Sequence, residues 1–358
     1  MRFLDKRGLL LLGVLLFGCG PKFDPPDQLS TLRILGVQKD LPYAQPGDTV
    51  NLQMLWEDAS PSAGRPIQLT WSGPCFDPEG DLYYGCFTKD QLPSLISGLN
   101  HDPTTQFTMP QDIISRRPPS TENNAPYGIA FVFFAACAGN LVPITTTEQT
   151  ALPFACQDAA GNPLGSDDFV AGYTSIYSFK TFKNNNPVIS DFEFNGQTLP
   201  NTSYCGPALP NTDPTNQPAD CVPLAEAPPP DPDSINCATT PPDPRCIPVC
   251  ADDGKSPCPA YAIQPTVDKN NPLNQDQDDV SVMQLGHPVG EQMWIDYYTD
   301  GGGFKSPVRL LNDATSGWND DYGTDFYASK DAKISRVWAL VHDNRGGVAW
   351  AGITLKTQ

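Results

Sequence analysis

The run Ile334-Ser-Arg-Val-Trp-Ala-Leu-Val-His342 is followed by Asp343-Asn-Arg-Gly-Gly347 and then by Val348-Ala-Trp-Ala-Gly-Ile-Thr-Leu-Lys356. Apolar side chains alternate between two faces of the first run, with Val337 on one face and Trp338 on the other. A period of two over this length predicts a β-strand. Two such runs joined by a short glycine-containing loop predict a β-hairpin.

Shorter runs of the same kind recur along the chain, at residues 32–37, 50–56, 67–71, 177–181, 188–194 and 291–298. The run Ile129-Ala-Phe-Val-Phe-Phe-Ala135 is apolar throughout, which predicts a strand buried on both faces. One short helix is expected, at Gln91–Ser97. Many strands separated by turns, with almost no helical periodicity, predict an all-β fold.

The 358 residues exceed the size of one sandwich, so we expect two Ig-like antiparallel β-sandwich domains, residues 31–183 and 187–358. The polar segment Asn184-Asn-Asn-Pro187 stands between two strand-like runs and marks the boundary. Within the second domain, sixteen of the 61 positions at 200–260 are proline. We therefore expect an irregular, disulfide-stapled insertion there, with little core of its own.

Two short segments carry a resemblance to a known class. Thr31-Leu-Arg-Ile-Leu-Gly-Val37 followed by Pro46-Gly-Asp-Thr-Val50 resembles the opening of Ig-like or PKD-like modules in poorly characterised lipoproteins of Gram-negative bacteria. The hairpin from Trp338 to Trp350 is similar to the closing hairpin of the same class. The resemblance implies an extracellular binding or spacing module and implies no reaction.

The N-terminus has the layout of a secretory signal: a basic head, an apolar run at 9–17 and a small residue before Cys19. That run is too short to span a bilayer. Leu16-Phe-Gly-Cys19 also resembles a bacterial lipobox, which implies cleavage after residue 18 and lipidation of Cys19. We expect a membrane anchor through that lipid, the outer membrane rather than the inner one, and a flexible tether over residues 19–30.

The other ten cysteines form an even group of four and an even group of six, which in an exported protein predicts disulfides. They are Cys75, Cys86, Cys137, Cys156, Cys205, Cys221, Cys237, Cys246, Cys250 and Cys258. Sequence leaves the connectivity open, and nearest neighbours are the simplest pairing. Zinc is not favoured at Cys246 and Cys250, because no second spaced pair accompanies them.

The composition excludes some partners. The chain carries 22 basic and 41 acidic residues, a formal net charge of −19, so binding to nucleic acid is not expected. No cofactor is predicted. Calcium is the one candidate ion, with hard oxygen ligands at Asp276 to Asp279, Asp167 with Asp168, and Asn319 to Asp321.

No catalytic motif is visible, and no catalytic residue is predicted. The histidines, His101, His287 and His342, are far apart in sequence. The candidates for contact with a glycan or peptide are aromatic: Tyr83, Tyr84, Tyr297, Tyr298, Trp318 and Tyr322.

The expected function is therefore a membrane-anchored, non-enzymatic binding, adhesion or structural module, whose partner is an envelope protein or glycan. The alternative is a secreted hydrolase that acts on polysaccharide or peptide through paired carboxylates. A concave pocket holding two carboxylates with raised pKa values would favour the hydrolase.

Overall fold

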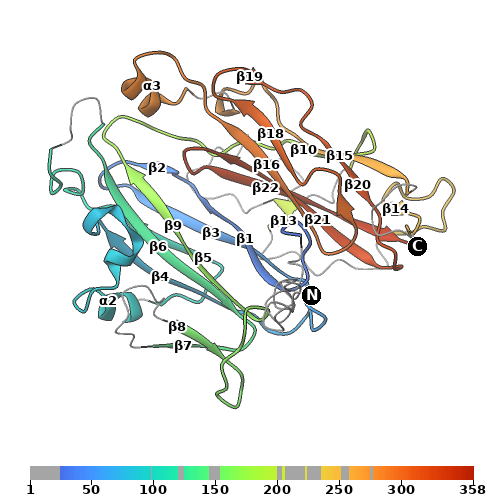
Figure 1. Ribbon diagram of the computed structural model, residues 1–358, viewed down its shortest axis with the longest axis horizontal. Coiled ribbons are helices and arrows are strands. Elements are labelled where there is room, and N and C mark those ends of the chain that lie inside the picture. Colours follow the sequence, from blue (N-terminus) through green and yellow to red (C-terminus); the bar gives the residue numbers. More distant parts are fainter. Residues whose placement is uncertain are drawn as a thin grey trace, which may run out of the picture.

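The computed structural model describes residues 25–97, 99–119, 125–144, 154–199, 204–205, 222–223, 235–250, 258–274 and 277–358. Strands are the main regular secondary structure of these residues, and they form two β-sandwiches, so the all-β prediction is confirmed. Below, the first unit is residues 31–183 and the second unit is residues 187–358. Figure 1 shows them as adjacent bodies, the first coloured blue to green and the second yellow-green to red.

The first unit has two sheets, mostly antiparallel, that face one another across a shared core. Its inner sheet has the order β1 (Leu32–Lys39), β3 (Thr49–Asp58) and β5 (Thr104–Thr108). Its outer sheet has the order β2 (Tyr43–Ala44), β9 (Phe169–Ser178), β6 (Gly128–Cys137) and β4 (Gln68–Phe76). The core between them includes Leu52 and Trp71, both nearly inaccessible to solvent.

Strand β6 is buried on both faces, as its unbroken apolar run predicts. Ala130 and Val132 face the core of the sandwich, while Phe131 and Phe133 pack into a second cluster on the outside. That outer cluster is covered by η2 (Tyr83–Cys86) and α2 (Leu92–Ser97), which is the expected short helix. The remaining small elements of this unit are η1 (Glu79–Asp81), β7 (Asn140–Pro143) and β8 (Phe154–Gln157).

The second unit is also a sandwich. Its outer sheet has the order β11 (Gln197–Thr198), β10 (Asp191–Phe194), β15 (Ala260–Thr266), β20 (Thr324–Tyr327) and β17 (Gly303–Phe304). Its inner sheet has the order β14 (Cys246–Ile247), β22 (Val348–Thr357), β21 (Ile334–Asp343), β16 (Met293–Thr299), β18 (Val308–Asp313) and β19 (Gly317–Trp318). Shorter elements are β12 (Tyr204–Cys205), β13 (Val222–Pro223), η5 (Pro272–Asn274) and α3 (Asp279–Leu285).

The hairpin β21–β22 separates its two faces as its alternation predicts. Val337 and Ile353 belong to the core of the second unit, whereas Trp338 and Trp350 point to the opposite side of the sheet. Those two side chains are nevertheless shielded from solvent: Trp338 is 0% exposed and Trp350 is 3% exposed. Something outside the second sandwich must therefore cover them.

The cover is the inner sheet of the first unit. One cluster joins the two units: Leu29, Leu55, Trp338, Leu340, Val348 and Trp350, with Leu35, Ala59 and Tyr298 packed against it. At Gly36 an added Cβ would lie 3.1 Å from Leu340 Cδ2, so the absence of a side chain there allows β1 to approach the hairpin closely. The four sheets consequently form a stack with three apolar layers between them.

The segment between the units is held by hydrogen bonds as well. Asn186 donates to the carbonyl of Lys39 (2.6 Å) and accepts from the backbone N–H of Val348 (3.0 Å). Asn184, 3% exposed, donates to Asp343 Oδ2 at 3.0 Å. Independent folding of residues 31–183 and 187–358 stays a prediction, and their separation would expose Trp338 and Trp350 to water.

Part of the expected tether is ordered. Leu29 donates its backbone N–H to the carbonyl of Thr299 (2.7 Å), and Thr299 donates in turn to Asp27 (2.9 Å). The Leu29 side chain is 5% exposed and lies in the cluster between the units. The prediction of a flexible tether is therefore wrong for residues 25–30, because an apolar side chain within them has a site to fill. Residues 19–24 lie outside the described residues.

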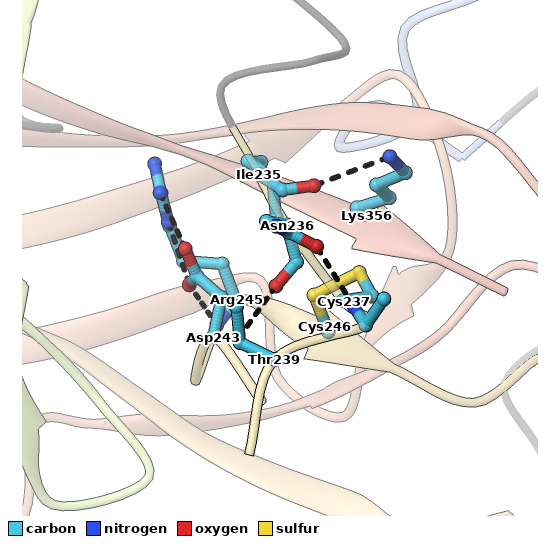
Figure 2. Close-up of a disulfide and its surroundings, with 9 residues drawn as sticks. Ile235, Asn236, Cys237, Thr239, Asp243, Arg245, Cys246 and Lys356 are labelled. Carbon is cyan, nitrogen blue, oxygen red and sulfur yellow. Dashed lines mark hydrogen bonds and ion pairs between the residues drawn. A yellow bond between two sulfur atoms is a disulfide. The ribbon is translucent and has the colours of Figure 1, made fainter. Parts of the chain in front are cut away.

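The insertion at 200–260 is also more than an appendage. Strand β14 pairs with β22 and extends the inner sheet, and Ile247 and Cys250 are buried in the core of the second unit. Figure 2 shows this anchor: the disulfide between Cys237 and Cys246, and Lys356 Nζ donating to the carbonyl of Ile235. The expectation of little ladder or core is wrong for residues 235–250. The two residues of β14 are not proline and lie at the edge of the sheet, so they can pair with β22 although prolines stand on either side of them.

This correction can be measured at one side chain. Replacing Ile247 by Ala should lower the free energy of unfolding by about 2–5 kcal/mol, because it removes buried methyl groups and leaves a cavity. Val249 is 44% exposed, so Val249→Ala is the matched control and should change it by less than about 0.5 kcal/mol. Urea unfolding under oxidising conditions compares the two. Equally small effects would mean that this segment does not contribute to the core.

Candidate functional site

A cleft of about 1220 Å³ opens where the two units meet. The first unit contributes the end of β3, the loop that follows it and the start of β4. The second unit contributes Asp300, which follows β16, and residues 333–338 at the start of β21. The walls come from both sandwiches, so the shape of the cleft depends on how the units are joined.

An ion pair between the units crosses the cleft. Arg336 Nη1 lies 3.0 and 2.8 Å from the two carboxylate oxygens of Glu57. The Glu57 side chain is 9% exposed and that of Arg336 19%. Burial raises the pKa of Glu57 above its usual range, and the Arg336 guanidinium acts in the opposite direction. The pair links β3 to β21 and leaves both groups at the cleft wall.

A second carboxylate lies on the same wall. Asp300 accepts the backbone N–H of Arg336 at 2.7 Å, and Lys333 Nζ donates to the backbone carbonyl of Asp300 at 2.6 Å. Burial raises the pKa of Asp300, while the positive charge of Lys333 lowers it. The cleft therefore holds two carboxylates with raised pKa values, which is the arrangement that the hydrolase alternative requires.

The loop after β3 is held by a third charged group. Arg65 donates to Asp58 at 2.9 Å and to Asp168 at 2.5 Å, so it ties the β3–β4 loop to the segment before β9. Hydrogen bonds from Arg65 and Ser60 hold the pKa of Asp58 below its usual range, although burial acts against them. The loop that forms one side of the cleft is thereby fixed to the body of the first unit.

None of these cleft residues stands out in the sequence. Glu57 and Arg336 are separated by 279 positions, and each is one polar residue in a strand. No spacing connects them, because the contact depends on how two sandwiches pack. Trp56 also lines the cleft, but the sequence pattern predicts only that it belongs to a strand with alternating apolar residues.

At the other end of β21 the junction contains buried charges. Arg345 donates to Glu291 at 3.0 and 2.7 Å, with side chains 2% and 1% exposed, and also contacts the backbone carbonyl of Lys183. Lys39, 4% exposed, lies near Thr174 and Asp343. Burial lowers the pKa of Lys39 to about 8. These groups fix the end of the junction opposite the cleft.

The three histidines do not come together. His101 lines the cleft and its Nδ1 is 3.0 Å from the carbonyl of Leu69, while His287 is exposed and contacts its neighbour Pro288. His342 stacks on Trp294, and burial, with the charge of Lys39, lowers its pKa to about 4. A shared metal or catalytic site of the three is not formed.

The acidic clusters that suggested calcium are engaged in other contacts. Asp278 caps α3 by accepting from Ser281, Asp168 binds Arg65, and Asp320 binds Lys269. Asp276 lies outside the described residues. In the described part of the chain, no group of three His, Cys, Asp or Glu side chains is arranged to hold a metal ion.

The six aromatic candidates lie elsewhere than the cleft. Tyr297 and Tyr322 are buried in the second unit, and Tyr298 packs at the junction. Tyr83 stacks on Tyr173 at 4.4 Å between ring centroids. Of the other two candidates, Tyr84 is 41% exposed, and Trp318 packs against the core of the second unit.

Among the described residues there are four disulfides, and all are nearest-neighbour pairs: Cys75–Cys86, Cys137–Cys156, Cys237–Cys246 and Cys250–Cys258. Cys221 lies outside the described residues, so the expected bridge to Cys205 is not part of the described structure. Cys19 lies outside them too. None of the described helices has the length and apolar content needed to cross a membrane.

No protein-family model matches this chain, and no curated protein matches it in sequence. Among solved structures it is similar to fibronectin(III)-like modules of CbhA from Clostridium thermocellum, with 8% identity, 91% of this chain and 93% of that chain covered, and a TM-score of 0.19. Domains FN1–FN3 of chicken CNTN1 give 9% identity, 93% and 68% coverage, and a TM-score of 0.19.

The three N-terminal domains of the outer capsid protein Hoc of bacteriophage RB49 give 7% identity, 91% and 70% coverage, and a TM-score of 0.16. Scores this low carry no argument about function. The assignment as a pair of β-sandwiches rests on the chain's own sheets.

Proposed function

We propose that this protein is a lipid-anchored module outside the cytoplasm that binds an envelope ligand in the cleft between its two sandwiches and catalyses no reaction. The observation that carries the proposal is the cleft itself. Its walls come from two units that are packed together by a buried apolar layer, so a binding surface is preformed. Preformed concave sites of this kind are where proteins usually hold ligands.

The anchor is supported by the signal-like N-terminus and the lipobox resemblance at Cys19. The described residues start at Pro25, and a chain of this length, from Cys19 to Pro25, can span at most about 20 Å. Gln28 and Leu29 contact the second unit beside Asp300, which also lines the cleft. An anchored protein would therefore carry this side of the junction close to the bilayer surface.

The anchor is tested by replacing Cys19 with Ser in the producing bacterium. The variant should incorporate no labelled fatty acid and should move from the membrane fraction to the soluble fraction, because acyl chains supply the membrane affinity. Ser62→Ala, at an exposed position, is the control and should change neither the label nor the location. A second cysteine such as Cys86 is unsuitable, because replacing it would break a disulfide. A Cys19→Ser variant that keeps both its label and its membrane location contradicts the anchor.

Binding in the cleft is tested by filling its mouth. Ala63 is exposed and lines the cleft, so Ala63→Trp adds bulk there without disturbing a core. Material captured from solubilised envelope by the wild-type body should be reduced about tenfold with this variant. Ala160→Trp, at an exposed turn outside the cleft lining, is the matched control and should capture as the wild type does. Equal capture by all three proteins contradicts a binding role for the cleft.

A hydrolase is the second candidate, favoured by the raised pKa values of Glu57 and Asp300 in one cleft. The ion pair between Arg336 and Glu57 argues against a hydrolase. A guanidinium at hydrogen-bonding distance favours the ionised form of Glu57 and restrains the movement of its side chain. A hydrolase would shorten a polysaccharide or peptide, and Asp300→Asn would abolish that activity. Unchanged substrate length with the wild-type protein rules the hydrolase out for the substrate tested.

A further inference from the structure

The charges of the cleft cancel, although the whole chain is strongly acidic. Among the described residues that line the cleft, the carboxylates are Glu57, Asp58 and Asp300, and the cations are Arg65, Lys333 and Arg336. The chain as a whole has a formal net charge of −19. A ligand with a large charge of either sign would thus find no opposite net charge on these walls.

The charged groups are also fixed in place. Glu57 is held by Arg336, Asp58 is held by Arg65, and Asp300 accepts a backbone N–H. Planar carboxylates keep further lone-pair sites beyond one or two such bonds, and an ammonium such as that of Lys333 has three donors. The walls therefore present oriented acceptors and donors that suit hydroxyl groups, which can both donate and accept.

Apolar surface separates these polar groups. Trp56, Ile67 and Ile334 line the cleft and are each partly exposed. The cleft walls therefore offer apolar surface beside their charged groups.

We infer that the cleft binds a neutral oligosaccharide. Sugar rings combine apolar C–H faces, which pack on aromatic and aliphatic side chains, with hydroxyls that match fixed carboxylate, ammonium and guanidinium groups. The volume of about 1220 Å³ exceeds the roughly 300–1000 Å³ of ordinary small-ligand pockets, which leaves room for more than one ring. This inference rests on the proposed function, because it names the ligand class of the same cleft.

The test titrates the oxidised full chain, in detergent, with three neutral oligosaccharides: hexamers of β-linked glucose, α-linked glucose and N-acetylglucosamine. An acidic and a basic peptide of similar mass are the charged probes, and tryptophan fluorescence is the readout. At least one saccharide should bind about tenfold more tightly than either peptide. Its affinity should change less than about twofold between low and high salt, because screening acts on charged partners.

The variants locate the binding. Ala63→Trp should weaken saccharide binding about tenfold, and Ala160→Trp should leave it unchanged. The inference is overturned if no saccharide binds, if a peptide binds more tightly, or if Ala63→Trp binds saccharide as the wild type does. Envelope capture separates the two proposals: when it still depends on Ala63 while no saccharide binds, the ligand class is wrong and the cleft remains a binding site. When Ala63→Trp changes neither result, both proposals fail.

Discussion

The packing of Trp338, Leu340 and Trp350 against the first unit is the contact on which the rest of the structure depends. These side chains project from the hairpin β21–β22 on the face that its own sandwich does not use, and each is at most 3% exposed. A sheet with large apolar side chains on both faces must be covered twice, since leaving an indole or a leucine in water forfeits about 1.5–3 kcal/mol of burial. The inner sheet of the first unit provides the second cover, and Gly36 allows the close approach.

This packing determines where polar groups meet. At one end of β21 it brings Arg336 to Glu57 and creates the cleft, and at the other end it encloses Arg345 with Glu291. Buried ion pairs add little stability by themselves, because desolvation offsets much of their attraction, but removing one partner is costly. They therefore restrict how the two sheets can be placed on one another, while the apolar cluster supplies the attraction.

Sequence reasoning predicted the strands well, because period two is a local property that each residue carries with it. It predicted the separation of Val337 from Trp338 and the doubly buried β6. It predicted disulfides but left their connectivity open, and the four described bridges follow the simplest pairing, between nearest neighbours. It did not predict what covers Trp338, since alternation specifies two faces without naming a partner. The nearly unbroken apolar run of β22 was the available signal of burial on both faces. The cleft was not predictable, because its charged residues come from distant parts of the chain. The packing of residues 25–30 and 235–250 was not predictable either, because side chains within them, such as Leu29 and Ile247, fill sites formed by strands distant in sequence.

The central claim is that the two sandwiches are one cooperative body. Differential scanning calorimetry of the oxidised full chain, compared with Leu340→Ala, tests it most directly. The account predicts one transition whose calorimetric and van't Hoff enthalpies agree, and a single shift of that whole transition to lower temperature in the variant. Two separate transitions in the wild type, with Leu340→Ala moving neither or only one of them, would contradict it.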